Sequence, residues 1–426
     1  MHIVVGIDIN DLEHDPISQD VDLIVVINAS PFYVGKGKEY EHAARNVCTR
    51  YNVAMIYVNQ VGGQDEMIFD GGSFIMNNKG NYDILPVFWR EEIIYHKFCD
   101  NINVITVHTK LRSKSSILQP GQMFETEEYD AEIYQALMIS LRDYVQKNGF
   151  HKVLLGLSGG VDSALVATIA VDTLGSENVR CVALPSEFSS EHSKVDAQIL
   201  AHDLGCEFDV ISIDAAKDVI GNSLAGVCGK FGIEKTGENI QARIRGIMLM
   251  AISNKFNELL LSTSNKSESA VGYTTIYGDM CGGFALIGDL YKTQIYRIVK
   301  WRNRNIPYDS KLERYNIIPA SIINKEPSAE LKPNQYDKDT LPPYHILDKI
   351  LYWLIEEPLE ITAISVKLSV ELEVVSTIHN MLLQSEFKRM QSPCAPKISK
   401  RCFRYERKYP LSNGFRVDLG QKVHIA

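Results

Sequence analysis

The chain alternates short apolar segments with polar or glycine-containing turns, and the spacing of its apolar residues changes along its length. Between residues 1 and 110 the apolar segments are short and rich in β-branched residues, which favours strands. The pattern predicts strands at His2–Ile7, Val21–Ile27, Val53–Val58, Ser73–Met76 and Val104–Val107, turns at 61–65 and 78–81, and one helix at Glu39–Arg50. We therefore expect a layered α and β domain in this region.

From residue 152 to about 300, strand and helix patterns follow one another in regular alternation. Strands are predicted at Val153–Leu157, Val179–Leu184, Phe208–Ile213 and Glu258–Ser262, and helices at Asp162–Leu174, Glu191–Leu204, Asn239–Asn254 and Lys292–Asn303. Such alternation is typical of an α/β domain whose parallel sheet is covered by helices on both faces.

The segment between these regions is polar, contains Pro and Gly, and lacks periodicity, so we expect a linker at 111–128. Helical spacing then covers Tyr129–Asn148. Two or three further helices are predicted around His345–Glu356 and Val374–Arg389, followed by a basic tail at 397–408. The predicted domains are therefore 1–110 and 129–426.

Composition narrows the class of protein. The chain has 426 residues, 45% hydrophobic and 23% charged, which fits an ordinary globular protein with two or three domains. Its formal charge of −9 argues against a general nucleic-acid or anionic-membrane binder. The eight cysteines show neither a CxxC pair nor zinc-site spacing. Without an apolar segment of about 18 residues or a signal-type N-terminus, we expect a cytoplasmic protein with reduced thiols.

The most informative segment is Ser158-Gly159-Gly160-Val161-Asp162-Ser163, which joins an apolar strand to a predicted helix. Its glycines allow a ligand to approach the backbone, and the helix start directs free N–H groups toward an anion. The segment lacks the lysine of GxxxxGK[ST], so it is not the usual nucleoside-triphosphatase loop. The alternative is a glycine-rich turn that binds nothing.

This hexapeptide resembles the SGGxDS signature of the PP-loop ATP pyrophosphatases, whose members cleave ATP between its α and β phosphates. The resemblance implies an adenine nucleotide alpha hydrolase-like fold. It implies that Gly156, Leu157, Ser158, Gly159, Gly160, Val161, Asp162 and Ser163 bind ATP, with Asp162 helping to hold Mg²⁺.

Further segments resemble NAD⁺ synthetase, in register from about 125 to 420. They are 238–245 (ENIQARIR), 261–268 (LSTSNKSE), 272–283 (GYTTIYGDMCGG), Lys292-Thr293, 327–331 (PSAEL), 339–344 (DTLPPY) and 392–399 (SPCAPKIS). The resemblance implies that deamido-NAD⁺ is adenylated by ATP with release of pyrophosphate. Ammonia then displaces AMP to give NAD⁺.

The same resemblance implies residue roles. Asp162, Glu268 and Lys292 would be catalytic, and Asp162 and Glu268 would hold Mg²⁺, a cation that prefers carboxylate, phosphate and water. Thr263, Lys292 and Ser328 would contact ATP, whereas Asn239, Arg243, Glu268, Tyr273 and Lys397 would position deamido-NAD⁺. Because charge develops on phosphoryl oxygens, we expect positioning and cationic stabilisation without a protein nucleophile.

Two local features qualify this picture. Ser264 stands where the family usually has glycine in a strand-to-helix turn. The segment Gly221–Gly237 is glycine-rich and precedes the dinucleotide motif, so we consider a mobile lid over the activated intermediate, with a plain surface loop as the alternative.

Residues 1 to about 110 resemble part of an αββα nitrilase-like glutaminase domain, which supplies ammonia from glutamine through a Glu, Lys and Cys triad. The matching segments are 29–36 (ASPFYVGK) and 57–73 (YVNQVGGQDEMIFDGGS). The stretch that carries the family's Glu and Lys is missing, and Ile9 occupies the place of the nucleophile. An alkyl side chain cannot form a thioester, so we expect the chain to use ammonia, free or from a separate amidase.

Two other functions remain open at this point. The chain could be another PP-loop adenylating amidotransferase similar to GMP synthetase, or a catalytically degenerate nucleotide-binding subunit. Family resemblance also suggests a homodimer or a higher homo-oligomer.

Overall fold

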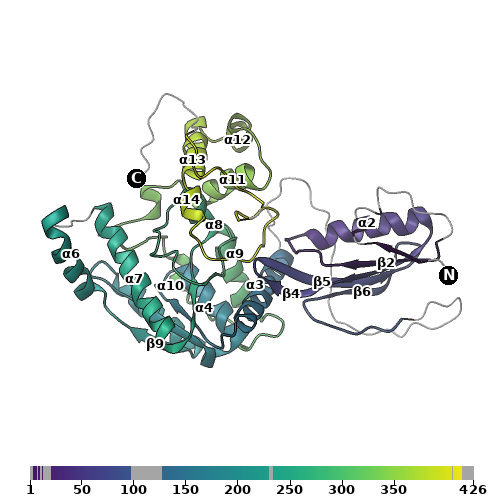
Figure 1. Cartoon of the computed structure of the whole chain (residues 1–426), viewed down its shortest axis with the longest axis horizontal. Coiled ribbons are helices and arrows are strands. Elements are labelled where there is room, and N and C mark those ends of the chain that lie inside the picture. Colours follow the sequence, from purple (N-terminus) through teal and green to yellow (C-terminus); the bar gives the residue numbers. More distant parts are fainter. Residues whose placement is uncertain are drawn as a thin grey trace. The chain divides into compact units, whose positions relative to one another are not determined.

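The computed structural model describes residues 3–6, 8–9, 12, 21–96, 127–229, 234–404 and 406–414. The chain divides into two compact units, residues 1–129 and 130–426 (Figure 1). The strand predicted at Val104–Val107 lies outside the described residues, as does the predicted linker apart from residues 127 and 128.

Unit 1 contains a mixed six-stranded sheet in the order β1-β2-β3-β5-β4, with β6 also paired to β5. Its strands are β1 (Ile3–Gly6), β2 (Leu23–Asn28), β3 (Ala54–Asn59), β4 (Val61–Gln64), β5 (Met67–Met76) and β6 (Tyr82–Phe88). The first three strands are parallel, whereas β5 runs antiparallel to β3, β4 and β6. The residues of β2 and β3 that face the helix of this unit are apolar and buried in its core.

Helix α2 (Lys36–Tyr51) lies along this sheet (Figure 1). Its buried face, which includes Val47, belongs to the same apolar core as Ile24 and Met55 of the sheet. Ile9 is also part of this core and has no exposed surface. The predicted helix at 39–50 is therefore confirmed, and it is longer at its N-terminus.

The turn predicted at 61–65 is wrong, because residues 61–64 form β4 and pair with β5. Gly62 and Gly63 are buried opposite Phe69 and Ile68, so their lack of side chains reflects close packing of the two strands. The turn lies at Asp65, whose φ is 55°. Strand β6 was not predicted, since Pro86 weakens its strand pattern.

Unit 2 contains a five-stranded parallel sheet in the order β11-β10-β7-β8-β9, which confirms the predicted α/β class. The strands are β7 (Val153–Gly156), β8 (Val179–Ala183), β9 (Glu207–Val210), β10 (Leu259–Ser262) and β11 (Phe284–Ala285). The central position of β7 places the phosphate-loop candidate at the carboxyl edge of the sheet, where ligands of open α/β sheets bind.

Helices cover both faces of this sheet. They are α3 (Glu127–Lys147), α4 (Val161–Leu174), α5 (Glu191–Leu204), α6 (Asp214–Cys228), α7 (Lys235–Phe256), α8 (Lys266–Val271), α9 (Lys292–Arg304) and α10 (Ala320–Asn324). Ile244 of α7 packs in one core with Leu154 and Leu260 of the sheet. Helix α4 packs against β7 and β8 and is buried almost all round, because α5 and α9 cover it.

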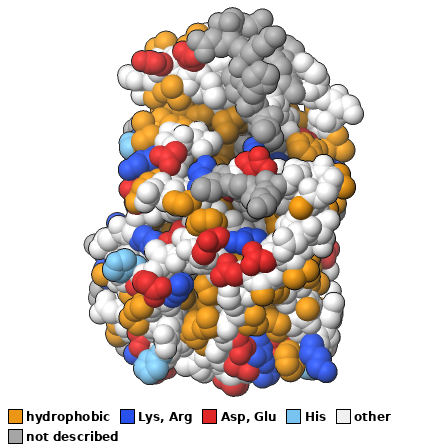
Figure 2. Space-filling model, turned by 90° about the vertical axis from the view of Figure 1, so that its left-hand side faces the viewer, with side chains coloured by type: hydrophobic (Ala, Val, Ile, Leu, Met, Phe, Trp, Pro, Cys, Tyr) orange, Lys and Arg blue, Asp and Glu red, His pale blue; other side chains and the backbone are white. Residues whose placement is uncertain are grey.

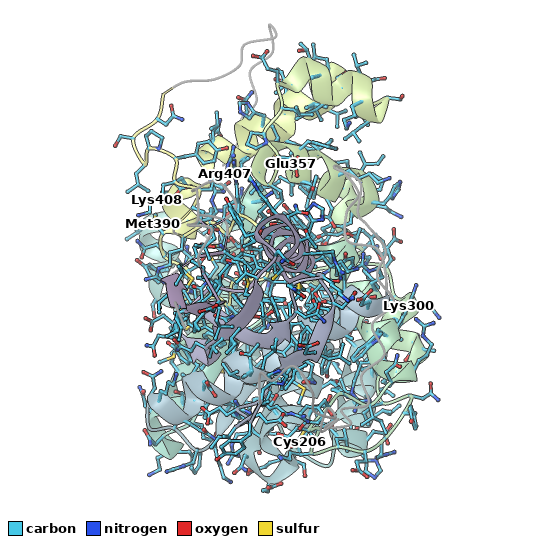
Figure 3. All side chains as sticks on the ribbon, turned by 90° about the vertical axis from the view of Figure 1, so that its right-hand side faces the viewer. Cys206, Lys300, Glu357, Met390, Arg407 and Lys408 are labelled. Atoms are coloured by element: carbon cyan, nitrogen blue, oxygen red, sulfur yellow. The ribbon has the colours of Figure 1, made fainter. Side chains whose placement is uncertain are left out.

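The C-terminal helices α11 (Tyr344–Ile355), α12 (Ile361–Leu368), α13 (Leu372–Gln384) and α14 (Glu386–Arg389) gather into a second layer of unit 2 (Figure 1). The chain then returns to the end of α11. Arg407, labelled in Figure 3 close to Glu357, donates a hydrogen bond of 3.3 Å to the carbonyl of Ile355.

The segment Gly221–Gly237, considered as a mobile lid or a surface loop, is largely helical where the structure describes it. Residues 221–228 form the last turns of α6, which ends at Gly229 with a φ of 72°, and residues 235–237 begin α7. Apolar residues at helical spacing, including Leu224 and Val227, outweigh the local glycines. Residues 230–233 lie outside the described part of the chain.

The surface agrees with the modest net charge. On the face seen in Figure 2, the described acidic and basic side chains are interspersed rather than gathered by sign. None of the described helices combines the length and apolar character needed to cross a membrane.

A buried ion pair between Asp172 of α4 and Arg302 of α9 links these two helices. Asp172 accepts hydrogen bonds from Arg302 Nε at 2.6 Å and Nη2 at 2.9 Å, and from the hydroxyls of Tyr134 and Ser310. Both charged side chains have no exposed surface. Each charge therefore depends on the other for compensation.

We expect Asp172→Ala to destabilise unit 2 by about 3–5 kcal/mol, because it leaves the Arg302 guanidinium buried without its counter-charge. Glu191→Ala is the control, since Glu191 is 82% exposed in its pair with Lys194 and should cost about 1 kcal/mol or less. Urea unfolding followed by circular dichroism measures both. Equal losses for the two variants would contradict this role of the pair.

Candidate active site

The segment from Ser158 to Ser163 forms a tight loop between β7 and α4. Gly159 has a φ of 75°, and a Cβ there would lie 2.3 Å from the carbonyl oxygen of Ser193. Ser163 Oγ accepts a hydrogen bond from the Ser158 N–H at 3.2 Å and donates one to the Gly160 carbonyl at 3.0 Å. Only glycine fits at position 159, and the serines hold the loop in shape.

Helix α4 begins directly after this loop with Gly160 as its N-cap, and no side chain caps it. The first backbone N–H groups of a helix have no intrahelical acceptor and carry a partial positive charge. Because the loop lines a cavity, these donors are available to an anion such as a phosphate group.

Three charged side chains from different elements meet beside the loop. Lys292, at the start of α9, contacts Asp162 of α4 through Nζ and lies 3.3 Å from Glu268 Oε1 of α8. Asn265, the N-cap of α8, donates to Asp162 Oδ1 at 3.2 Å and accepts from the Glu268 N–H at 2.9 Å. The structure therefore brings together the three residues predicted to be catalytic.

Burial and proximity change the proton affinities of this cluster. Burial raises the pKa of Glu268 to about 8, with Lys292 opposing and Asp162 reinforcing the shift. Burial lowers the pKa of Lys292, but the Asp162 and Glu268 carboxylates raise it by more. Lys292 therefore stays positively charged, and Glu268 holds its proton more tightly than an ordinary glutamate.

The cluster lies in a cavity of about 1150 Å³ at the carboxyl edge of the sheet. This volume exceeds the range of about 300–1,000 Å³ found for single drug-sized ligands. The cavity has room for more than one nucleotide-sized molecule.

Most of the predicted site residues line this cavity. They are Gly156, Leu157, Ser158, Gly160, Val161, Asp162, Ser163, Asn239, Arg243, Thr263, Glu268, Tyr273, Lys292 and Ser328. Gly159 is not among the lining residues, because it packs against Ser193. Ser264 has no positive φ and donates to the Asp279 carbonyl at 3.1 Å, so serine fits where the family usually has glycine.

Lys397 is not among the residues that line this cavity. It is 6% exposed and forms an ion pair with Glu406. The ion pair joins two parts of the C-terminal segment, and the contact of Lys397 with deamido-NAD⁺ stays a prediction.

Asn239, Arg243 and Tyr273 converge on one wall of the cavity. Asn239 Oδ1 accepts from Thr275 Oγ1 at 2.8 Å, and Arg243 Nε donates to the Ile276 carbonyl at 3.2 Å. Helix α7 thus holds the 273–276 turn in place while its own polar side chains remain at the cavity surface.

Sequence analysis did not assign Glu330, which joins the loop side of the cavity to the 325–331 segment. It accepts hydrogen bonds from Ser190 Oγ at 2.9 Å, Ser193 Oγ at 2.7 Å and Lys325 Nζ at 3.0 Å. Burial raises the pKa of Glu330, but these hydrogen bonds lower it by more. The sequence feature that could have identified Glu330 is its position in the segment 327–331 (PSAEL), which resembles NAD⁺ synthetase.

Two other buried polar groups at the cavity were also not assigned. Asp337 is 6% exposed and accepts from the Tyr344 hydroxyl at 2.8 Å, and burial raises its pKa. Burial lowers the pKa of Arg245 to about 10, and its Nε donates to the Leu184 carbonyl at 3.0 Å. Arg245 follows Arg243 by two residues, whereas no local pattern singles out Asp337.

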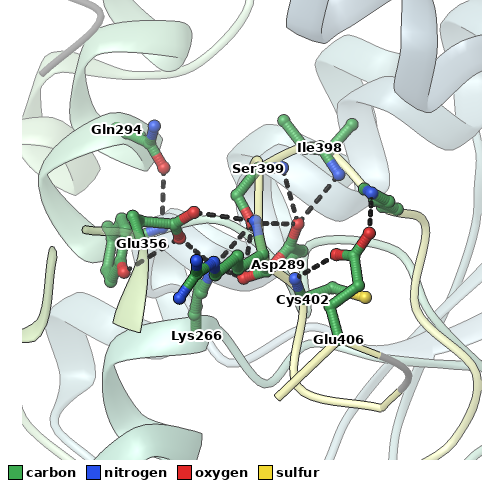
Figure 4. A network of polar contacts seen from close by, with 11 residues as sticks. Lys266, Asp289, Gln294, Glu356, Ile398, Ser399, Cys402 and Glu406 are labelled. Atoms are coloured by element: carbon green, nitrogen blue, oxygen red, sulfur yellow. Dashed lines mark hydrogen bonds and ion pairs between the residues drawn. The ribbon is translucent and has the colours of Figure 1, made fainter. Parts of the chain in front are cut away.

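A buried ionic network supports the segments that carry Glu268 and Lys292. Figure 4 shows Lys266 between Asp289 and Glu356, at 2.9 Å and 2.5 Å. Asp289 also accepts the backbone N–H groups of Ile398 and Ser399 at 2.8 Å and 2.7 Å. The network therefore ties α8, the start of α9, α11 and the C-terminal segment together.

Asp348 of α11 provides a second tie beneath the cluster. It accepts from Ser267 Oγ at 2.6 Å, from the Thr293 N–H at 2.8 Å and from Thr293 Oγ1 at 2.7 Å. Ser267 Oγ in turn accepts the Lys292 N–H at 2.9 Å. The neighbours of Glu268 and Lys292 in the chain are thus held by one carboxylate.

Comparison with known proteins gives a consistent result. The NAD synthase family model matches residues 133–392. The chain is 42% identical over 399 residues to the glutamine-dependent NAD(+) synthetase of Acinetobacter baylyi, covering 94% of this chain and 70% of that protein. It is 42% identical over 412 residues to the Aquifex aeolicus protein of that name, covering 92% and 71%.

Solved structures show the same similarity. The glutamine-dependent NAD+ synthetase from Acinetobacter baumannii, in complex with ADP, superposes with a TM-score of 0.65 at 36% identity, covering 98% of this chain and 73% of that one. The Cytophaga hutchinsonii enzyme superposes with a TM-score of 0.74 at 20% identity, which shows a shared fold.

The tie at Asp348 predicts a pH dependence of stability. Burial raises its pKa to about 6 from an ordinary value of 3.8. Between these values the folded chain binds more protons than the unfolded chain, so the free energy of unfolding falls as pH rises. Relative to Asp348→Asn, the wild-type chain should lose about 2 kcal/mol between pH 4 and pH 6. Urea unfolding across this range measures it, and a constant difference between the two chains would contradict it.

Proposed function

Because the chain belongs to the NAD synthase family, we propose that it amidates deamido-NAD⁺ to NAD⁺ in an ATP-dependent reaction through an adenylated nicotinate. The observation that carries this proposal is the meeting of Asp162, Glu268 and Lys292 beside the phosphate loop, in a cavity of about 1150 Å³. A glycine-rich loop with free N–H groups at a helix start, two carboxyl groups and a buried lysine suit the transfer of an adenylyl group.

In the first step, a carboxylate oxygen of deamido-NAD⁺ attacks the α-phosphorus of ATP, and the bond to the β-phosphate oxygen breaks. The N–H groups at the start of α4 receive the departing pyrophosphate. Lys292 neutralises negative charge on the phosphoryl oxygens, and its burial strengthens that interaction. Thr263 and Ser328 contribute hydroxyls at the cavity surface.

The residues present also fit a magnesium ion bound together with the nucleotide. Among the described residues, no three His, Cys, Asp or Glu side chains form a metal-binding group by themselves. Mg²⁺ is usually held by one or two carboxylates together with substrate phosphates and water. Asp162 and Glu268 would supply these carboxylates, and the ion would neutralise charge on the phosphates.

The wall formed by Asn239, Arg243 and Tyr273 is the proposed place for the dinucleotide. An amide, a guanidinium and a phenol at one surface offer hydrogen bonds, a positive charge and a stacking face. In the second step, ammonia attacks the adenylated carboxyl carbon, a proton leaves the nitrogen, and the bond to AMP breaks.

We propose further that the 426-residue chain does not produce this ammonia from glutamine. Ile9, which stands in the nucleophile's place, has no exposed surface and packs in the unit 1 core. A cavity near Lys36, Asn59 and Asp70 measures about 20 Å³ in the described part of unit 1, room for about one water molecule. Free ammonia, or ammonia from a separate amidase, would then serve as the nitrogen donor.

The two alternative functions receive less support. A GMP synthetase-like enzyme would accept xanthosine monophosphate, whereas the family match favours deamido-NAD⁺. A catalytically degenerate subunit would have no reason to keep Asp162, Glu268 and Lys292 in contact. A cytoplasmic location and a homodimer stay predictions from composition and from resemblance.

We expect NAD⁺ to form from deamido-NAD⁺, ATP and Mg²⁺ with ammonium chloride, and at least about 100-fold more slowly with glutamine. Glutamine labelled with ¹⁵N at its amide identifies the nitrogen source, and mass spectrometry of NAD⁺ measures its incorporation. Comparable rates with labelled glutamine would contradict the loss of glutaminase activity while leaving NAD⁺ synthesis intact.

Asp162→Asn serves as the control for the synthetase site in the same assay. It should lower the ammonium-dependent rate by at least about 100-fold without a change in circular dichroism, because a carboxylate beside the phosphates is lost. Full activity of this variant, or no NAD⁺ from the wild-type chain with ammonium, would overturn the proposed function.

A further inference from the structure

Cys181 and Cys206 form a close thiol pair on the face of the sheet covered by α4 and α5. Their sulfur atoms are 3.5 Å apart, although 24 residues separate them in the chain. Cys181 lies in β8, and Cys206 directly follows Gly205, which ends α5. The pair does not line the active-site cavity.

Secondary structure holds both residues of the pair in place. Cys181 is paired in the sheet with Leu155 of β7 and with Phe208 of β9. Gly205 adopts a φ of 69°, which turns the chain out of α5, and the Cys206 N–H then donates to the Ala201 carbonyl at 3.2 Å. The short distance between the sulfurs is therefore a consequence of the fold rather than of two mobile loops.

The two thiols differ in access and in acidity. Cys181 has no exposed surface, whereas Cys206 is partly exposed and is labelled in Figure 3. The hydrogen bond between the sulfurs lowers the pKa of Cys206 and, together with burial, raises that of Cys181. Burial raises the pKa of Cys48 in unit 1 to about 12. Cys206 is thus the accessible and more nucleophilic thiol of its pair.

We propose that Cys206 and Cys181 are an oxidative modification site, at which hydrogen peroxide converts the two thiols into a reversible disulfide. The Cys206 thiolate attacks one peroxide oxygen, the O–O bond breaks, and after protonation Cys206 sulfenic acid and water are formed. The Cys181 sulfur then attacks the Cys206 sulfur, loses its proton and releases a second water. Two thiols and one peroxide give one disulfide and two waters.

Bond formation requires only a small movement. The sulfurs must approach from 3.5 Å to about 2.05 Å, the length of a disulfide bond. Because Cys181 is already in contact, it can react with the sulfenic acid before a second peroxide oxidises Cys206 to the irreversible sulfinic acid. The pair therefore protects Cys206 from permanent damage.

The disulfide should not block catalysis. Ser190 and Ser193, which contact Glu330 at the cavity, lie at the N-terminus of α5, and Cys206 follows its C-terminus. The 14 residues of α5 separate these ends by roughly 21 Å. The bond would close a loop that contains α5 and so restrict the unfolded chain.

The test exposes the full-length chain to hydrogen peroxide, blocks remaining thiols with N-ethylmaleimide under denaturing conditions, and maps peptides by mass spectrometry. The expected product is a peptide containing Cys181 linked to one containing Cys206, which dithiothreitol separates. Oxidation should raise Tm by about 5 °C and leave the rate of NAD⁺ formation within twofold. Because the linkage is read by mass, its failure is distinct from failure of the proposed function.

Variants give the matched controls. Cys181→Ala keeps the core apolar and should leave Cys206 as a sulfenic acid that dimedone labels, whereas Cys206→Ser should leave Cys181 reduced. Cys228→Ser, at an exposed cysteine of α6, should retain the linkage. Cys206 found as sulfinic acid beside a free Cys181, linked to a second chain, or unmodified when Cys228 is oxidised would overturn the proposal. In Cys181→Ala, a Cys206 that stays reduced even at alkaline pH, where its thiolate forms without help from Cys181, would overturn its role as the first thiol to react.

Discussion

The candidate active site depends on the contact of Lys292 with two carboxylates. Asp162 precedes Lys292 by 130 residues and Glu268 precedes it by 24, so only the tertiary fold brings the three together. A lysine with 3% exposure is costly to bury unless counter-charges compensate it. The same requirement places the loop before α4 next to the starts of α8 and α9, which defines the chemistry of the cavity.

Helix α11 explains how this contact is maintained. Asp348 binds the residues next to Glu268 and Lys292, and Glu356 joins Asp289 in compensating Lys266. All of these side chains are nearly or fully buried, so the cluster lies on a rigid polar base rather than on loops. The C-terminal segment completes this base through Ile398 and Ser399, which donate to Asp289.

Sequence patterns over a few residues correctly predicted the elements that such patterns determine, namely capped helices and the glycine-rich loop. The helix at Glu191–Leu204 has its predicted bounds, because Ser190 and Gly205 are strong capping residues. The glycine-rich loop at 158–163 was also visible, since strand, glycines and helix follow one another directly. Helix α6 and strand β4 were missed because their glycines were read as turn or loop signals, although residues at helical spacing in α6 and pairing with β5 decide the structure there. The residue roles at the cavity rest on family resemblance and await experiment.

The most direct test of adenylyl transfer is the exchange of labelled pyrophosphate into ATP without ammonia or glutamine. The wild-type chain should catalyse exchange only when deamido-NAD⁺ is present, and xanthosine monophosphate should not replace it. Lys292→Met should lose exchange by at least about 100-fold, whereas Lys300→Met, an exposed lysine of the same helix, should retain it. Absence of exchange in the wild-type chain with deamido-NAD⁺, or unchanged exchange in Lys292→Met, would contradict adenylyl transfer at the cluster of Asp162, Glu268 and Lys292.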